Sequence, residues 1–387
     1  MSKFPQEFLW GTATAAHQVE GNNTTSDWWH IEHIKPPVVA EPSGDACDSF
    51  NRYREDIAII KGLGLNAYRF SIEWARIEPE DNFFSQAMLD HYRSMIEETI
   101  KAGLEPVVTL QHFTLPQWFR ISGAWQRPDA AEIFTRYVEK VIPILSGVKR
   151  VVTINEPNIY GGILAAQSGV QGKGFLPEPR PEDVTGLIAA HRAAVKVLKL
   201  KTDLEVGWSV ANLLLLPADP GAETKARELS HIYDDQFIEV SRGDDFIGVQ
   251  SYSVTFTNCN GEIVLPEGYT PTDMGYAFLP DAVGRAIRYV NEKAPGVPIY
   301  VTENGCSSHD DSIRQEYLRG ALEAVAACIA EGRDVRGYFH WSLLDNFEWA
   351  AGYKQKFGLV ECDRTTFKRT PKPSAHLYKE LVHHYSR

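Results

Sequence analysis

The sequence lacks the features that mark membrane-spanning, secreted and disulfide-rich proteins. Its five cysteines are odd in number and widely spaced, and no CxxC pair occurs, so neither a zinc ribbon nor a disulfide framework is predicted. No run approaches the ~18 apolar residues of a membrane span. Pro5, Gln6 and Glu7 interrupt the N-terminus where a signal peptide would carry its apolar region. These absences predict a cytoplasmic protein that does not bind membranes.

Clusters of positive charge are also missing. The net charge is −12 and the isoelectric point is about 5.5, and no Lys/Arg patch is interleaved with aromatic residues. A nucleic acid partner is therefore not expected. The acidic balance favours solubility and weakly disfavours anionic substrates.

Motifs for metals and nucleotides are absent. No HExxH sequence occurs, and the pair His30 and His33 is too local to form a metal site by itself. Gly62-Leu-Gly64-Leu-Asn-Ala67 resembles a dinucleotide-binding glycine motif, but it lies between an expected helix and an expected strand, which is the wrong order. The prediction is that the protein needs no metal and no cofactor.

Eight short apolar or β-rich runs are present, and helical periodicity separates most of them. Phe50, Tyr53, Ile57 and Ile60, for example, follow a helical spacing that can end at Gly62. Strand and helix alternating about eight times predict an α/β fold, a (β/α)₈ TIM barrel, over a doubly wound open sheet. The expected strands are Phe8–Ala15, Ala67–Trp74, Pro106–Phe113, Val151–Asn155, Glu205–Ala211, Phe246–Tyr252, Ile299–Glu303 and Arg336–Leu343.

Nothing in the sequence divides the chain into parts. There is no internal repeat and no low-complexity linker, and the Gly- and Pro-rich stretch Gly169–Pro181 is explained by a single loop after the fourth strand. We therefore expect one catalytic domain over residues 1–387. Because a plain barrel needs roughly 250 residues, the excess should lie in elaborated loops and added helices.

Polar residues follow the expected strands where each strand ends. Buried strands that end on a charge are costly unless the charge has a partner or a use. In a barrel these carboxyl ends converge on one face, where the active sites of such folds lie. The residues concerned include Gln18, Arg69, His112, Asn155, Glu156, Gln250, Tyr252, Glu303, Trp341, Glu348 and Trp349.

Glu156 and Glu303 lie at the ends of the fourth and seventh expected strands. Taken alone, Glu303 after the apolar run from Pro298 is most simply a cap or the partner of an arginine. Two carboxylates across a barrel mouth are instead what glycoside hydrolysis requires. Aromatic residues near the strand ends suit the C–H faces of a sugar, although any one of them could be core packing. These are Trp118, Tyr252, Trp341, Trp349 and Tyr353.

The sequence resembles glycoside hydrolase family 1, the retaining β-glucosidases, over essentially its full length. Five segments match in order and at matching strand ends. They are Phe8-Leu-Trp-Gly-Thr-Ala-Thr-Ala-Ala-His-Gln18-Val-Glu-Gly21, Tyr68-Arg69-Phe-Ser-Ile, Thr153-Ile-Asn155-Glu156-Pro157, Val301-Thr-Glu303-Asn-Gly305 and Trp341-Ser-Leu-Leu-Asp-Asn-Phe-Glu348-Trp349.

The resemblance implies a role for each matching residue. Glu303 would be the nucleophile, with Arg69 favouring its ionised form, and Glu156 would be the acid/base, with a raised pKa. Arg69 and Tyr252 would hold the nucleophile. Sugar contacts would come from Gln18, His112, Asn155, Tyr252, Trp341, Glu348 and Trp349, with Gln250 in support. The family usually has Asn-Tyr-Tyr where this chain has Gln250-Ser251-Tyr252, and the regions after Gly169 and between Asn212 and Asp245 look shortened.

The implied activity is hydrolysis of terminal non-reducing β-D-glucosyl residues, and also galactosyl or fucosyl residues, through a covalent glycosyl-enzyme. The partners would be small β-glycosides or oligosaccharides. Two enzyme alternatives stay open: a transglycosylating β-glycosidase and a 6-phospho-β-glycosidase, the latter disfavoured by the carboxylate of Glu348. Outside this class, a sugar-binding protein on an inactive barrel would lack one carboxylate, and a metal-dependent hydrolase would need clustered histidines.

Overall fold

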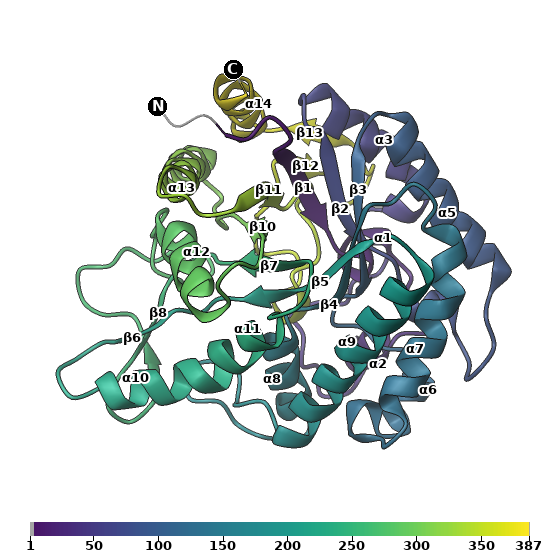
Figure 1. Cartoon of the computed structure of the whole chain (residues 1–387), viewed down its shortest axis with the longest axis horizontal. Coiled ribbons are helices and arrows are strands. Elements are labelled where there is room, and N and C mark those ends of the chain that lie inside the picture. Colours follow the sequence, from purple (N-terminus) through teal and green to yellow (C-terminus); the bar gives the residue numbers. More distant parts are fainter. Residues whose placement is uncertain (1–3, 387) are drawn as a thin grey trace.

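The computed structural model describes residues 4–386 and forms a closed parallel barrel enclosed by helices (Figure 1). Around the barrel the strand order is β1-β11-β10-β7-β5-β4-β3-β2, and every neighbouring pair is parallel. Each parallel connection needs a crossover, and the helices between the strands supply it. The predicted TIM barrel is confirmed.

All eight expected strands are present, with ends that shift by a few residues. They are β1 (Leu9–Thr14), β2 (Ala67–Ser71), β3 (Glu105–Gln111), β4 (Arg150–Asn155), β5 (Glu205–Ala211), β7 (Phe246–Gln250), β10 (Ile299–Asn304) and β11 (Val335–Trp341). Five short strands lie outside the barrel: β6 (Leu215–Pro217), β8 (Thr255–Thr257), β9 (Ile263–Val264), β12 (Val360–Cys362) and β13 (Arg369–Pro371).

The helices cover the outside of the barrel and extend several of its loops. The longer ones are α3 (Ser49–Gly62), α5 (Gln86–Lys101), α7 (Ala130–Val141), α8 (Pro157–Gln167), α9 (Pro181–Lys201), α10 (Glu223–Ser230), α12 (Ala282–Lys293), α13 (Asp311–Ala330) and α14 (Pro373–Tyr385). The shorter ones are α1 (Ala16–Glu20), α2 (Asp27–Glu32), α4 (Trp74–Ile77), α6 (Gln117–Ile121), α11 (Gln236–Val240) and η1 (Ala124–Gln126), η2 (Ile142–Ile144), η3 (His231–Asp235) and η4 (Trp349–Ala351).

Helix α5 shows how the sequence sets these elements. The Ser85 side chain accepts a hydrogen bond from the Met88 amide at the start of the helix. Leu89, Tyr92 and Ile96 then recur at helical spacing and are buried against the barrel. Gly103, with φ of +76°, follows the last turn in the left-handed conformation that glycine tolerates best.

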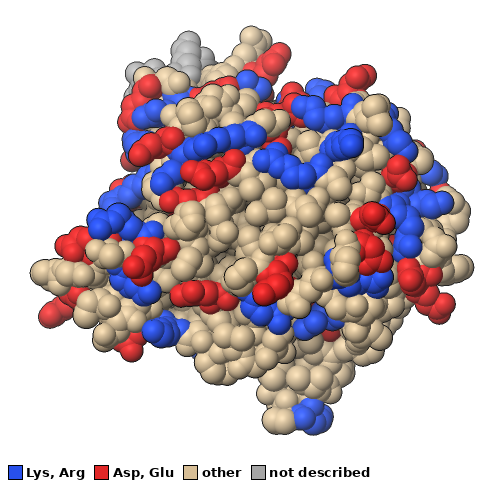
Figure 2. All heavy atoms as spheres, turned by 60° about the horizontal axis from the view of Figure 1, so that its bottom comes forward, with Lys and Arg blue, Asp and Glu red and all other residues tan. Residues whose placement is uncertain are grey.

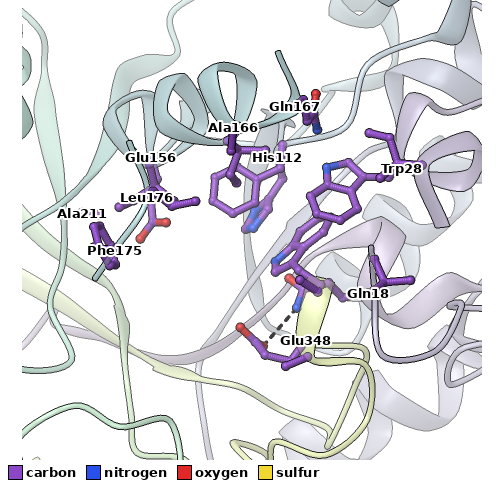
Figure 3. A pocket seen from close by; sticks show the side chains of 18 of the residues that line it. Gln18, Trp28, His112, Glu156, Ala166, Gln167, Phe175, Leu176, Ala211 and Glu348 are labelled. Atoms are coloured by element: carbon purple, nitrogen blue, oxygen red, sulfur yellow. Dashed lines mark hydrogen bonds between the residues drawn. The ribbon is translucent and has the colours of Figure 1, made fainter. Parts of the chain in front are cut away.

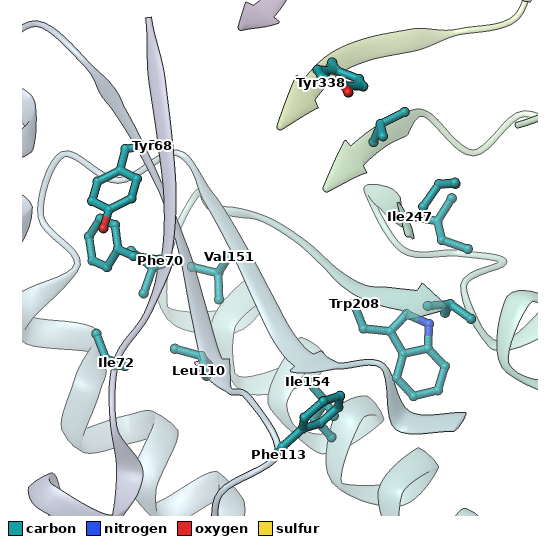
Figure 4. Close-up of a cluster of buried hydrophobic side chains, with 14 of the residues drawn as sticks. Tyr68, Phe70, Ile72, Leu110, Phe113, Val151, Ile154, Trp208, Ile247 and Tyr338 are labelled. Carbon is teal, nitrogen blue, oxygen red and sulfur yellow. The ribbon is translucent and has the colours of Figure 1, made fainter. Parts of the chain in front are cut away.

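Alternate strand residues face two different interiors. Tyr68 and Phe70 of β2 belong to the large cluster between barrel and helices (Figure 4), whereas Ala67 belongs to a separate cluster with Phe339 and Trp341. This period of two is the strand repeat. Barrel residues such as Arg69 therefore share the inner face with the second cluster, close to the strand ends that carry the predicted site.

The two ends of the described chain lie together at one end of the molecule, beside α14 (Figure 1), where the Phe4 and Tyr385 ring centroids are 4.8 Å apart. Within residues 4–386, no helix is long and apolar enough to cross a membrane. The first three residues of the N-terminal stretch used to predict a cytoplasmic protein lie outside the described part of the chain. The single catalytic domain over residues 1–387 and the cytoplasmic location stay predictions.

Candidate active site

A cavity of about 950 Å³ opens at the carboxyl ends of the barrel strands. Of the predicted site residues, all but Arg69 and Asn155 line it, and those two are hydrogen-bonded to residues at its floor. Figure 3 shows His112 in the middle of the cavity, with Glu156 on one side and the bonded pair Gln18 and Glu348 on another. The lining includes Gln18, His112, Glu156, Gln250, Tyr252, Glu303, Trp341, Glu348 and Trp349.

The Glu303 carboxylate is surrounded by hydrogen-bond donors. Its Oε1 atom accepts from Arg69 Nη1 at 2.6 Å and from Gln250 Nε2 at 2.8 Å, and its Oε2 atom accepts from the Tyr252 hydroxyl at 2.6 Å. Burial raises the pKa of Glu303, while the Arg69 charge and these donated bonds act in the opposite direction. Burial also raises the pKa of Tyr252 well above its usual range, so this phenol keeps its proton and donates.

Glu156 has no comparable support. Within residues 4–386, its carboxyl group makes no hydrogen bond to a side chain or to the backbone, although the residue is buried. Burial raises its pKa well above the ordinary range, and the negative charge of Glu303, with that of Glu348 when it is ionised, adds to this rise. Of the two carboxyl groups, Glu156 has the more strongly raised pKa, because the Arg69 charge and three donors offset the burial of Glu303.

The backbone presents both acids at a break in strand regularity. The register of β4 against β5 shifts between Val152 and Asn155, and that of β10 against β7 shifts between Val301 and Glu303. Such irregularities redirect side chains next to active sites. Glu156 then adopts a left-handed backbone, with φ of 43°, before Pro157 begins α8.

Two donors connect the strands that carry the acids. Arg69 reaches Asn155 Oδ1 with Nη2 at 2.5 Å while its Nη1 holds Glu303. Gln250 Nε2 does the same, at 2.9 Å from Asn155 Oδ1 and 2.8 Å from Glu303 Oε1. The long side chain of Gln250, where the family usually has Asn, therefore bridges the residue before Glu156 and Glu303 itself.

Several buried polar atoms of the lining have no partner. Gln18 Oε1, His112 Nδ1 and Gln250 Oε1 are fully enclosed and unbonded within the described residues. Such atoms are rare in native proteins and call for an explanation, a polar ligand being one. Burial and the nearby Arg69 charge hold the pKa of His112 well below its usual range, so the ring is neutral. A neutral ring and an amide can exchange hydrogen bonds with hydroxyl groups.

Glu348 lies beside Gln18, with Gln18 Nε2 donating to its Oε2 at 3.4 Å. Burial, with the Glu303 charge, raises the pKa of Glu348 to about 8. In the free protein at neutral pH this group therefore carries a proton, and it can both donate and accept hydrogen bonds.

Aromatic rings form one wall of the polar end. Trp341 and Trp349 both lie nearly parallel to His112, with ring centroids 5.9 Å and 6.2 Å from it. Of the aromatic residues near the strand ends, Trp118 and Tyr353 do not line the cavity, and for these two the alternative of packing within the protein applies. The Trp118 indole donates to the Glu78 carbonyl, and the Tyr353 hydroxyl donates to the Ser43 carbonyl, each serving the protein itself.

Several residues that line the cavity were not predicted from the sequence. Asn212 follows β5 directly, so the rule that found its neighbours applied to it as well. Trp28, Phe175 and Leu176 lie on α2 and in the loop between α8 and α9, and no strand end marks them. Within residues 4–386, no group of three or more His, Cys, Asp and Glu side chains could hold a metal ion, and the absence of a metal or cofactor stays a prediction.

A buried carboxylate held by three donors and a second buried carboxyl group with a strongly raised pKa, both facing one cavity, are a pair that can attack and protonate an acetal. With the barrel, this defines a glycoside hydrolase of the (β/α)₈ class. The model of the family described as Glycosyl hydrolase family 1 matches residues 1–244 and 231–386. The chain belongs to this family, which confirms the predicted resemblance and the predicted enzyme class, a hydrolase of the β-glucosidase group.

Individual relatives match along nearly their whole length. Beta-glucosidase A of Thermotoga maritima is 32% identical over 438 residues, which cover 99% of this chain and 98% of the relative. The crystal structure of beta-glycosidase BGL167 superposes with a TM-score of 0.91 at 42% identity, covering 98% of this chain and 97% of that one. The Thermotoga maritima beta-glucosidase in complex with deoxynojirimycin superposes with a TM-score of 0.90 at 30% identity, covering 100% and 99%.

Proposed function

We propose that this family 1 enzyme is a retaining β-glucosidase that removes terminal non-reducing β-D-glucosyl residues, and also galactosyl or fucosyl residues, by double displacement. The proposal rests on one observation: the two acids differ in the number of hydrogen bonds that their carboxyl groups accept. Glu303 receives bonds from Arg69, Gln250 and Tyr252, and Glu156 receives none within the described residues. Glu303 is then the nucleophile and Glu156 the acid/base.

In the first step, the Glu303 carboxylate attacks the anomeric carbon and Glu156 gives its proton to the departing oxygen. The ester formed on Glu303 carries no charge, so one of the causes that raise the pKa of Glu156 disappears. Glu156 can then act as a base toward water, which attacks the ester and releases the sugar with its original configuration. Arg69 and Tyr252 favour the departing carboxylate in this second step.

The polar end of the cavity would hold the sugar. Gln18, His112, Glu348 and Trp349 face it with groups that can bond hydroxyls, while Asn155 supports His112 through a 3.3 Å contact. The flat face of Trp341 would pack against the C–H surface of the ring. The similar Thermotoga maritima beta-glucosidase has been solved in complex with deoxynojirimycin, which supports a ligand of this kind for the present chain.

A phosphorylated sugar fits this cavity poorly. Arg120 is the one Lys or Arg among the described residues that line it, and its Nε atom is engaged with Gln167 Oε1 at 3.3 Å. A sugar phosphate needs positive partners, and the 6-phospho-β-glycosidase alternative has none at the polar end. Transglycosylation stays a candidate because it differs only in whether water or a hydroxyl group of a second sugar attacks the ester.

The test is a panel of nitrophenyl β-glycosides of glucose, galactose, fucose and glucose 6-phosphate, run with and without EDTA. The β-glucoside should be hydrolysed at equal rates with and without the chelator, with the β-anomer of glucose seen first by NMR. If the α-anomer of glucose appeared first, the retaining mechanism would be overturned. If the glucoside 6-phosphate were the preferred substrate, the conclusion that the polar end favours unphosphorylated sugars would be overturned. Product analysis at high glucoside concentration would reveal transfer.

A further inference from the structure

Helix α8 turns an apolar face toward the cavity. Ile159, Ile163 and Ala166 line the cavity and are spaced by four and three residues, which puts them on one side of the helix. The helix begins one residue after Glu156. This face therefore lies along the path of the group whose oxygen takes the Glu156 proton.

The loop between α8 and α9 adds a second apolar surface beside this face. Phe175 and Leu176 line the same cavity as Glu156, and all three are labelled in Figure 3. The loop packs tightly on α8, because a Cβ atom on Gly162 would come within 3.1 Å of the Leu176 Cβ. The Tyr233 hydroxyl also donates to the Leu176 carbonyl at 2.8 Å. The surface is thus built against rigid neighbours.

Across the mouth, large apolar side chains remain in water. Ile34, Val38 and Ile121 line the cavity, yet they are 46%, 55% and 74% exposed. Figure 2, which brings forward the part of the molecule that carries α6 and α8 in Figure 1, shows charged residues mainly toward the upper and outer edges and a largely uncharged lower middle. Apolar residues gathered in this way at a cavity mouth mark a binding surface.

The two charged residues of this outer part, Asp27 and Arg120, both have hydrogen-bond partners within the protein. Asp27 Oδ1 accepts from the Leu115 and Trp28 amides, and burial raises the pKa of Asp27 to about 7. Arg120 donates to Gln167. The rest of this outer lining is mostly apolar, with polar side chains such as Gln117, Gln167 and Asn212 set among the apolar ones.

We propose that the preferred leaving group is an extended apolar alcohol, an alkyl or fused-ring aglycone, bound along Ile159, Ile163, Phe175 and Leu176 and reaching the rim at Ile34 and Ile121. The proposal rests on the β-glucosidase function proposed above. It follows from continuity: the apolar surface starts beside Glu156, where the leaving oxygen must lie, and continues over these residues toward the mouth. Along this surface a second sugar would leave its hydroxyls facing apolar carbon.

A series of alkyl β-D-glucosides tests it, measured below the concentrations at which they form micelles. If each methylene is about half buried, kcat/KM should rise about twofold per carbon, on the order of 100-fold from methyl to octyl. Octyl glucoside should also exceed cellobiose. A flat series, or a preference for cellobiose, overturns the proposal. Hydrolysis of methyl or nitrophenyl β-glucoside by the same preparation tests the underlying β-glucosidase function separately.

Variants locate the surface. Leu176→Asn and Ile159→Thr should each lower the octyl-to-methyl ratio of kcat/KM about tenfold, and Ile121→Thr, nearer the water, about threefold. Ile100→Thr makes the same exchange at a part-exposed site outside the cavity and should keep the wild-type ratio. If the octyl-to-methyl ratio of kcat/KM were the same in all four variants, the assignment of the surface would be overturned. A flat alkyl series with concentration-dependent dimerisation in sedimentation would assign the rim to a second copy of the chain.

Discussion

The two ends of the cavity are built from different parts of the fold and from different chemistry. The inner end is made by strand ends and carries acids, amides and a neutral histidine, held by bonds such as Arg69 to Glu303. The outer end is made by α2, α6, α8 and the loop after α8, and it is mostly aliphatic. Under the proposed function, the strand ends would hold the sugar, while the added helices and loops would contact its leaving group.

Glu156 lies where the two ends meet. It follows the last residue of β4 and precedes the first residue of α8, so one carboxyl group belongs to both regions. Glu303 is instead enclosed by inner-end donors. Changes at the inner end should therefore affect all substrates, and changes toward the outer end should affect substrates according to their leaving group.

The largest effect should come from removing the inner-end nucleophile. Glu303→Gly should lower kcat by on the order of 10⁶-fold, the size seen when enzymes lose a nucleophile, for every glycoside tested. Azide should restore turnover by entering the vacated space, and the product should be the α-glycosyl azide, identified by NMR. A β-glycosyl azide would contradict the role of Glu303, and the exposed Glu361→Gly should stay fully active.

The next effect should depend on the leaving group. Glu156→Ala should reduce kcat/KM about 10²- to 10⁴-fold for alkyl glucosides, whose oxygen needs a proton to depart. Dinitrophenyl glucoside needs no such proton and should lose far less in its first step. Steady-state rates with both substrates check this. Equal losses would mean that Glu156 supports the structure rather than transferring a proton.

The same division explains what the sequence could reveal. A charge or amide directly after a buried run is visible in the sequence, which is why nearly the whole inner end, from Gln18 to Trp349, was predicted with the barrel. Asn212 satisfied that rule and was overlooked. The outer end left no such mark, because apolar residues such as Ile159 and Leu176 look like core until the fold shows which face they turn to. Conversely, Trp118 and Tyr353 lie near expected strand ends in the sequence, but in the fold they do not line the cavity.

A pH-dependent difference in stability should follow from the acids of the inner end. The folded-state pKa of Glu348 is raised to about 8 from the ordinary value of 4.5, so the folded protein retains a proton that the unfolded chain releases. Wild-type stability is then fully present below about pH 4.5 and falls as the pH rises toward 8. Glu348→Gln removes this loss, and the variant should gain about 1–3 kcal/mol relative to wild type between pH 5 and pH 8.5.

Urea unfolding at the two pH values measures the gain from Glu348→Gln. The exposed Glu380→Gln on α14 makes the same chemical change outside the cavity and should show no such difference. An unchanged difference between wild type and Glu348→Gln at pH 5 and pH 8.5 would contradict the raised pKa of Glu348.

The smallest effect should come from shortening the Gln250 bridge between Asn155 and Glu303. Asn at this position is one methylene shorter and cannot span both Asn155 Oδ1 and Glu303 Oε1, which Gln250 Nε2 reaches at 2.9 Å and 2.8 Å. A donor lost from a carboxylate raises its pKa. Gln250→Asn should thus lower kcat/KM about tenfold and move the acidic limb of its pH profile upward by less than about one unit.

Gln355→Asn, which shortens a buried amide bonded to Ser307 outside the cavity lining, is the matched control. Because the bridge belongs to the inner end, methyl and octyl glucosides should lose equally, and a loss confined to one of them would show that the two ends are coupled through it.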